Sequence, residues 1–369
     1  MEETIDVNPI PYLTWSWLKI NKDSGTFDFP LCENKGNDIQ IPAGVLVSEG
    51  KTVKTELPEP ENSIGKDAAK IITDAAQGKI YTFEKDCDQP LIIRIKADSN
   101  SATHNIIHAK AGVNCKVIIV YEGGPSTPST PSTGSGTAGT AENAVFSRII
   151  TKVYAEDDSN VQIAKVQLFK NSVYQIDDTQ FVCGDRAKAN LIQIELGGAH
   201  IDAGFHATLH GYQSRFTSDT AYICRDNQYV DMNQVVVHTG KKTDCNMKTD
   251  GTVKDDSTKT YRGTIDMRKG CSGSTGNEME TTLLLSPKAV VKAAPIILCG
   301  EDDIAAEHGS TVGKLSPEMM FYINTRGIDQ ETAEAMLTRA KITAAAANIP
   351  EEKIRQEINN WLDTEIGQD

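Results

Sequence analysis

Alternating apolar and polar positions run through most of the chain after residue 66. One helix-like segment, KDAAKIITDAA, comes first, and short runs rich in Val, Ile, Thr and Tyr follow it. Such runs are typical of half-buried strands. They are PLIIRIKA, CKVIIVYE, SRIITKVYA, VQIAKVQLF, NLIQIELGG, HATLHGY, AYICR, NQVVVHTG, YRGTIDMR, TTLLLS and APIILC. The pattern predicts a mainly β body.

The connections between these runs indicate how the strands are arranged. Only Asp250-Gly251 has the dipeptide signature of a tight hairpin, and most other connections are short polar breaks. Short strands at regular spacing would otherwise suggest a sandwich or barrel. Strands joined without tight hairpins suit a parallel β-helix, in which each coil stacks on the previous one. We therefore expect a parallel β-helix, although no strict repeat period is visible.

The two ends of the chain follow other patterns. The first region is interrupted by prolines and carries an apolar group that we expect to pack on the body. This group comprises Tyr12, Leu13, Trp15, Trp17 and Leu18. We expect three regions: a docking segment over 1–65, a β-helix core over 66–313 and a helical region over 314–369.

The helical region has recognisable start signals. Ser316 followed by Pro317 predicts one helix start, and Asp329 predicts the next. A third helix, PEEKIRQEINNWLDTEI, places Ile354, Ile358 and Trp361 on one face. These helices should either fold back on the β body or present an apolar face to another protein.

The segment GGPSTPSTPSTGSGTAGTAE, residues 123–142, contains no large apolar side chain. Because such a segment can bury almost nothing, we expect a disordered insertion between two coils.

Composition narrows the class of protein. With 39% hydrophobic and 24% charged residues in 369, no apolar run approaches the roughly 20 residues of a membrane span. The start, MEETIDVNPIPYLTWSW, is acidic and lacks the pattern of a secretory signal, which predicts a cytoplasmic protein. The net charge of -14 argues against nucleic-acid and membrane partners and favours proteins or small ions. The eight cysteines form no CxxC pair.

Most enzyme signatures are absent from the chain. It contains no GxxxxGK[ST], GxGxxG, HExxH or GxSxG motif. The histidine pairs in HNIIH and HATLH are spaced four apart, which on a strand separates the rings by roughly 13 Å, too far for a shared metal. Asp226 and Asp231, with Arg225 and Arg262, leave one alternative: an intracellular β-helical carbohydrate-active enzyme.

The stretch CGEDDIAAEHGSTVG carries the strongest chemical signal. APIILC is expected to be a buried strand that ends at Cys299, GEDDIAA a polar excursion, and Glu307-His308 the start of the next strand or turn. Thiolate, carboxylate and imidazole could converge there, and that set suits iron or an iron-sulfur cluster. Because it is short of a full ligand set, it predicts a half-site completed by a second chain. The simpler alternative is a buried cysteine and a hydrogen-bonded histidine.

The segment EHGSTVGKLSPEMMFYINTRGIDQETAEAML closely resembles the C-terminal signature of the SufB/SufD family, the scaffold subunits of the SUF iron-sulfur cluster assembly machine. The match continues through YRGTIDM, TTLLLSPKAVV and the strand ending at Cys299, and NPIPYLTWSWLKIN resembles the entry segment of SufD-type proteins. The resemblance covers nearly all of the chain outside the Ser/Thr/Pro-rich insertion.

The resemblance implies a right-handed parallel β-helix, a dimer formed through its C-terminal part, and C-terminal helices that dock a SufC-like ABC ATPase. It implies a non-enzymatic scaffold with a transient Fe-S cluster, a SufB/SufD-type partner or a homodimer, and an indirect link to a cysteine desulfurase. A flavin is possible in such a protein, but nothing in the sequence indicates one. A purely structural ATPase-binding partner is the remaining alternative.

Particular residues carry the resemblance. His308 matches the interface histidine of the family, and Cys299 matches the cysteine that SufB-type members use as a ligand. SufB-type members place a glutamate directly after the histidine, where this chain has Gly309, so Glu307 would have to serve. The HGSTVG stretch is SufD-like. The residues expected to dock the ATPase are Pro317, Met319, Met320, Phe321, Tyr322 and Arg326.

Overall fold

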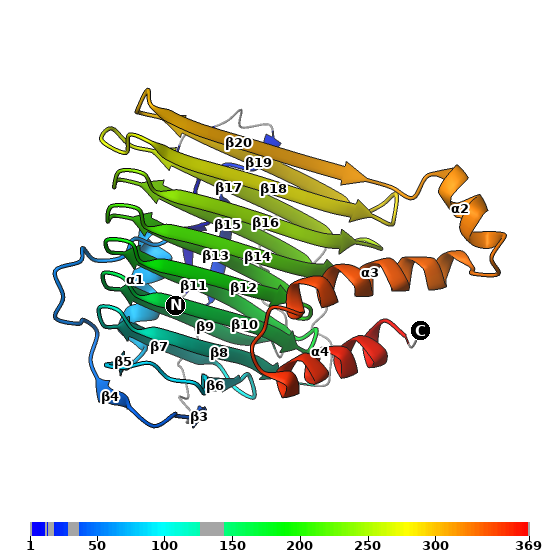
Figure 1. Cartoon of the computed structure of the whole chain (residues 1–369). Coiled ribbons are helices and arrows are strands. Elements are labelled where there is room, and N and C mark those ends of the chain that lie inside the picture. The colour runs from blue at the N-terminus through cyan, green and yellow to red at the C-terminus, as the bar shows by residue number, and fades with distance from the viewer. Residues whose placement is uncertain (1, 12, 14–17, 29–36, 126–143, 368–369) are drawn as a thin grey trace.

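Two nine-stranded sheets lie face to face and form a β-solenoid (Figure 1). The computed structural model describes residues 2–11, 13, 18–28, 37–125 and 144–367. Apart from the strands nearest the N-terminus, successive strands alternate between the two sheets, and each pairs in parallel with the strand two places away in the chain. The result is a mainly β chain of about 8 solenoid turns with helices at its C-terminal end, which confirms the predicted fold class.

The strands divide by number into an odd sheet and an even sheet. The odd sheet, which also includes β4, holds β4 (Val45–Glu49), β5 (Gly78–Phe83), β7 (Ser101–Ala109), β9 (Val145–Ala155), β11 (Val173–Cys183), β13 (His200–Leu209), β15 (Tyr229–His238), β17 (Thr258–Met267) and β19 (Val290–Cys299). The even sheet, which also includes β3, holds β3 (Asp38–Gln40), β6 (Leu91–Lys96), β8 (Asn114–Gly123), β10 (Asn160–Phe169), β12 (Lys188–Glu195), β14 (Arg215–Cys224), β16 (Asp244–Val253), β18 (Ser274–Leu284) and β20 (Ile304–Gly313). The antiparallel pair β1 (Glu2–Val7) and β2 (Asp23–Asp28) is separate.

The core lies between the sheets because alternate residues of every strand point inward. In β13, for example, Phe205, Ala207 and Leu209 all face inward and belong to one continuous apolar cluster with Phe181 and Phe216. The ring centroids of Phe205 and Phe216 are 5.1 Å apart across the interior. Side chains on the opposite face of each sheet pack under helices or reach solvent.

The coils differ in length, which explains why no repeat period is visible in the sequence. Asn160 pairs with Lys188, 28 residues on, and Lys188 pairs with Arg215, 27 residues on. Asn114 pairs with Asn160, 46 residues on, because the Ser/Thr/Pro-rich segment lies in that coil. Residues 126–143 of this predicted disordered insertion are outside the described part of the chain.

Two local predictions are wrong. Asp250-Gly251 forms no hairpin, because both residues lie inside β16, where a Cβ on Gly251 would come within 2.4 Å of the Tyr222 ring. APIILC does end strand β19 at Cys299, but this strand is mostly half-buried rather than buried. The reason is that no further coil stacks on β19 in the described structure.

Helices cover the outer faces of the solenoid. α1 (Lys66–Ala75) packs with the N-terminal segment on the odd sheet, where Val7, Ile64 and Ile72 are buried against Ile150 and Ile176. On the even sheet lie α3 (Gln330–Ala346) and α4 (Glu352–Glu365), while α2 (Pro317–Asn324) projects past the strand ends (Figure 1). No helix in the described ranges is long and apolar enough to cross a membrane.

The helix starts follow the predicted caps. The Ser316 side chain accepts a hydrogen bond from the backbone N–H of Met319, and Asp329 does the same for Thr332. In α4, the predicted apolar face packs on the β body, where Ile354 and Ile358 are buried, so the first of the two alternatives for this helix holds.

The apolar faces of α3 and α4 therefore pack on their own domain. Leu362 is the third buried residue of α4, and Trp361 is half-buried beside the same cluster, with the Arg225 guanidinium 5.5 Å from its ring centroid. This packing uses the outward apolar side chains of β8, β10, β12 and β14.

Two residues of the predicted N-terminal apolar group are described: Leu13 is 81% exposed and Leu18 is half-buried. Tyr12, Trp15 and Trp17 lie outside the described residues, so the packing of the group stays a prediction. Among the described residues, Ile5, Val7 and Ile64 supply apolar contacts of this segment. The boundaries at 65/66 and 313/314 stay a prediction.

We expect Ile358→Ala to lower the free energy of unfolding by about 2–5 kcal/mol, because the truncation leaves a cavity between α4 and the even sheet. Asn359→Ala, at an exposed position of the same helix, should change it by about 0.5 kcal/mol or less. Urea unfolding of both variants measures the difference. Equal effects would contradict the docking of α4 described above.

Candidate functional site

The last coil of the solenoid has an uncovered end. Strands β19 and β20 stand last in their sheets, so each has a neighbouring strand on one side only. At the other end the antiparallel strands β3 and β4 close the two sheets. Val290 and Val312 on the last coil are 43% and 48% exposed. Unpaired edges beside exposed apolar side chains favour association with another chain.

All three predicted ligand residues lie on this open end. Cys299 is the last residue of β19 and is exposed, whereas the other six cysteines in the described ranges are buried. Glu307 and His308 are consecutive, exposed residues of β20. The strand already begins at Ile304, so the polar excursion is shorter than predicted.

The single chain does not assemble these residues into a ligand set. Cys299 belongs to the odd sheet, and Glu307 and His308 belong to the even sheet. Consecutive strand residues also point to opposite faces, so Glu307 and His308 are directed apart. In the described residues, the one group of three ligand side chains within 4.8 Å of one another lies elsewhere. The half-site stays a prediction that requires a second chain.

A buried ion pair lies one coil below His308, and the sequence analysis missed it. Lys259 of β17 pairs with Glu280 of β18, and both side chains are fully buried. Glu280 also accepts hydrogen bonds from the Thr282 and Ser310 hydroxyls, each at 2.5 Å. The Lys259 ammonium lies 4.9 Å from the ring centroid of Tyr261. These contacts compensate both charges, as a buried pair requires.

Glu278 lies on the same inward face of β18 but has no such compensation. Its side chain is fully buried, and neither carboxylate oxygen has a hydrogen-bond partner among the described residues. Burial raises the pKa of Glu278 to about 7. Its register partner on the last coil is His308.

A sequence signal for these two carboxylates does exist. In the strand STGNEMETTLL, Glu278 and Glu280 are two residues apart, so both side chains point to the same face of the strand as Gly276 and Thr282. A strand with two glutamates on its inward row is unusual, because unpaired charge is costly in an interior. Using this signal requires knowing whether the even-numbered or the odd-numbered residues of the strand face inward.

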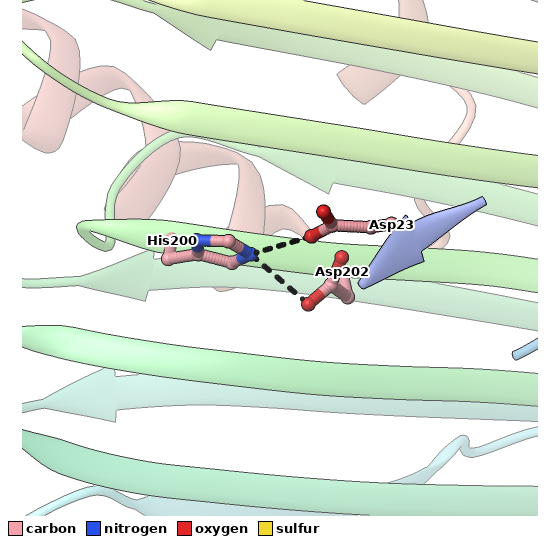
Figure 2. A group of neighbouring side chains, drawn as sticks. All are labelled: Asp23, His200 and Asp202. Carbon is pink, nitrogen blue, oxygen red and sulfur yellow. Dashed lines mark hydrogen bonds and ion pairs between the residues drawn. The ribbon is translucent and has the colours of Figure 1, made fainter. Parts of the chain in front are cut away.

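The group of three ligand side chains is Asp23, His200 and Asp202 (Figure 2). The Nε2 atom of His200 lies 3.1 Å from Asp202 and 3.4 Å from Asp23. Asp23 begins β2 of the N-terminal segment, and the other two residues lie on the outer face of β13. The His200 ring stacks between Tyr174 and Tyr229 at centroid distances of 5.7 and 4.6 Å.

We interpret this group as an ion network rather than a metal centre. Burial alone would lower the pKa of His200, but the Asp202 and Asp23 carboxylates outweigh it and raise the pKa to about 10. Both carboxylates reach the same nitrogen, which a protonated ring satisfies, and stacked tyrosines favour a cation. The network holds the N-terminal segment against the odd sheet.

The alternative carboxylate pair does not form an active-site pair. Asp231 is buried under the N-terminal segment, where it pairs with Arg262 and accepts a hydrogen bond from Asn8. Asp226 is an exposed turn residue. Arg225 is engaged by Glu365 of α4. These residues fix the N-terminal segment and the C-terminal helix.

The fold and the open end define a parallel β-solenoid protein whose last coil presents thiol, imidazole and carboxylate groups on uncovered strands. A family model described as "SUF system FeS cluster assembly, SufBD core domain" matches residues 93–341. This range covers more than half of the chain and most of the solenoid. The chain belongs to the SufB/SufD family of iron-sulfur cluster assembly proteins, as the resemblance predicts.

Individual relatives agree with this assignment. The chain is 24% identical over 229 residues to the iron-sulfur cluster assembly protein SufD of Bacillus subtilis, covering 61% of this chain and 52% of the relative. It is 23% identical over 210 residues to SufB of the same organism, covering 57% and 45%. A chloroplastic SufBD family protein of Arabidopsis thaliana, ABCI8, is 22% identical over 225 residues, covering 59% and 40%. The matches span about half the length of these relatives.

We expect His200→Gln to destabilise the protein, because it removes the cation between two buried carboxylates. The raised pKa of His200 stabilises the fold fully below about pH 6.5, and this contribution is lost as the pH rises through about 10. The deficit of the variant in free energy of unfolding should be on the order of 2–4 kcal/mol near pH 6 and should shrink towards pH 10. His210→Gln, at an exposed position, is the control. A deficit that does not depend on pH would contradict this assignment.

Proposed function

We propose that the chain is a non-enzymatic scaffold subunit of a SUF iron-sulfur cluster assembly complex. In this proposal it pairs through the open end of the solenoid with a SufB/SufD-type subunit, which is either another chain or a second copy. The observation that carries the proposal is that the one exposed cysteine of the described chain, Cys299, and the exposed His308 both belong to the uncovered last coil. The membership of the family supplies the cargo, an iron-sulfur cluster.

Pairing at this end would satisfy two physical requirements. The unpaired edges of β19 and β20 and the exposed Val290 and Val312 would be covered by the partner. The partner would also bring further ligand side chains towards Cys299, Glu307 and His308, which do not form a complete set in one chain. Soft thiolate favours an Fe-S cluster, and imidazole or carboxylate makes a more labile ligand that suits transient holding.

The proposed compartment is the cytoplasm. All seven cysteines in the described ranges are free thiols, which a reducing compartment maintains. An exposed cluster-binding thiol such as Cys299 would be lost to disulfide formation in an oxidising one.

The proposed partner at the C-terminal region is a SufC-like ABC ATPase, docked on α2. This helix buries none of its residues, unlike α3 and α4. It exposes Met319, Phe321 and Tyr322 by 51%, 72% and 58%. The Arg326 guanidinium lies 5.0 Å from the ring centroid of Tyr322 and donates a hydrogen bond to the Tyr322 hydroxyl. The surface of α2 therefore exposes an aromatic side chain paired with a cation. Pro317 starts the helix, and the half-buried Met320 completes the surface.

Anaerobic reconstitution with ferrous iron and sulfide tests the cluster site. We expect the visible charge-transfer absorption of the wild type to fall by more than half in Cys299→Ser and in His308→Ala, because each removes one ligand. His210→Ala, at an exposed histidine of the turn after β13, should keep the full absorption. Unchanged absorption in both ligand variants would remove the site assignment and leave the purely structural alternative.

Binding of the purified ATPase tests the docking surface. We expect Phe321→Asp to weaken binding at least tenfold, because it puts a charge into the centre of an aromatic contact. Met336→Asp is the matched control, since Met336 is a 43% exposed apolar residue of α3. Calorimetric titration of both variants gives the two affinities. Equal affinity of Phe321→Asp and the wild type would exclude α2 as the docking element.

A further inference from the structure

The inward row of β18 contains two carboxylates in contrasting surroundings. Glu280 meets a complete set of partners: the Lys259 ammonium and the hydroxyls of Thr282 and Ser310. Glu278, two residues earlier on the same face, is also fully buried, but it has no ion-pair partner and neither of its oxygens makes a hydrogen bond of the kind that Glu280 makes. A buried carboxylate without a paired cation is destabilising, so Glu278 lies in a less favourable site than Glu280.

The space around the Glu278 carboxylate is provided by a glycine. A Cβ on Gly263 of β17 would lie 1.9 Å from the Glu278 Oε1 atom and 2.7 Å from the Tyr261 hydroxyl oxygen. Any larger residue at position 263 would displace the carboxylate. The Tyr261 hydroxyl donates to Gln234 instead, at 3.3 Å. This hydroxyl also lies close enough to Glu278 to lower the pKa of its carboxyl, so the fold places a neutral donor beside the carboxylate but no paired cation.

His308 is the neighbour of Glu278 on the open side. The two residues are register partners in the parallel pair β18 and β20, whose strands are about 4.8 Å apart. Ala306 packs against the solenoid core, and Ser310 donates to Glu280, so the inward face of β20 is the face of even-numbered residues. His308 shares that parity and therefore faces the same side as Glu278. No strand covers it in the described structure.

We propose that Glu278 is an inner carboxylate ligand for ferrous iron, which enters at the open end of the solenoid and is held between Glu278 and His308. The proposal rests on the proposed function for the identity of the cation. A carboxylate oxygen and an imidazole nitrogen are a ligand pair suited to Fe²⁺. The remaining coordination positions face the open end, where a second subunit and sulfide have access.

An iron ion at this position would compensate the charge of Glu278 and would give His308 a partner within its own chain. An iron ion would supply the positive charge that Glu278 lacks and Glu280 already has from Lys259. It would also give the inward-facing His308 a partner on its own chain, whereas Glu307 points to the opposite face. One chain then holds iron before a partner adds further ligands.

Anaerobic equilibrium dialysis of the full-length chain against ferrous iron alone, without sulfide, tests the proposal. We expect Glu278→Gln and His308→Ala each to weaken iron binding at least tenfold. His210→Ala is the control for a surface histidine and should bind iron as the wild type does. Glutamine has the shape of glutamate, so Glu278→Gln removes the charge while it keeps the packing.

Thermal unfolding of the same samples separates ligand loss from misfolding. Glu278→Gln should melt no lower than the wild type at pH 8, because it replaces an uncompensated buried carboxylate. Glu280→Gln should melt lower, because it leaves the buried Lys259 without its counter-ion. A variant that gains stability while it loses iron behaves as a ligand variant rather than a packing variant.

The outcomes distinguish this proposal from the proposed function. If Glu278→Gln binds iron as tightly as the wild type while His308→Ala does not, Glu278 is not a ligand and the proposal is overturned, but the proposed scaffold function stands. If both variants bind iron as the wild type does, neither residue holds iron and the proposal is overturned, whereas the proposed scaffold function is still decided by reconstitution of Cys299→Ser with iron and sulfide. Weaker binding in both variants, with retained stability of Glu278→Gln, supports the proposal.

Discussion

Parallel stacking of one coil on the next is the constraint on which the rest of this structure depends. Every strand between the first and last coils satisfies its backbone groups through the coils on either side, as β10 does with β8 and β12. A solenoid built this way has no natural end. The antiparallel strands β3 and β4 close one end, and the described chain leaves β19 and β20 without a further neighbour at the other. The open end therefore combines unpaired backbone with the exposed Cys299 and His308.

The interior of the solenoid is mostly apolar but encloses charged side chains at two levels. Lys165, Asp177 and Glu195 lie in the middle coils, and Lys259, Glu278 and Glu280 lie in the last coils. A small number of fully compensated charges can be accommodated in such a core, and Lys259 with Glu280 is a pair of this kind. Glu278 has no such ion pair, neither of its oxygens has a hydrogen-bond partner among the described residues, and it lies next to the open end. The position of the uncompensated carboxylate supports a role in ligand binding rather than in stability.

The C-terminal helices divide between two roles on the same physical grounds. Ile342, Ile358 and Leu362 of α3 and α4 are buried against the outward apolar residues of the even sheet. These contacts fix both helices to their own domain. α2 has no buried residue and projects past the strand ends, so its aromatic side chains have no partner surface within the described chain (Figure 1). Burial of the apolar residues thus marks α3 and α4 as structural helices, whereas their exposure on α2 supports its proposed role in docking.

Much of the architecture could be predicted because it depends on local patterns. Alternation along the strands, the Ser316 and Asp329 caps and the C-terminal signature are all readable without coordinates. The structure confirms the solenoid and the helix caps, and the match to the family model confirms the family. Stacking across coils of unequal length is a long-range property, so sequence alone could not align Glu278 with His308. The sequence also predicted too much burial for the strand APIILC. An apolar strand is buried or half-buried according to whether another coil stacks on it, and the sequence does not show that. The sequence by itself therefore determined the strands, the caps and the ligand-type residues, and the tertiary structure decided which of them face one another, because only coil register brings residues about 30 positions apart into contact.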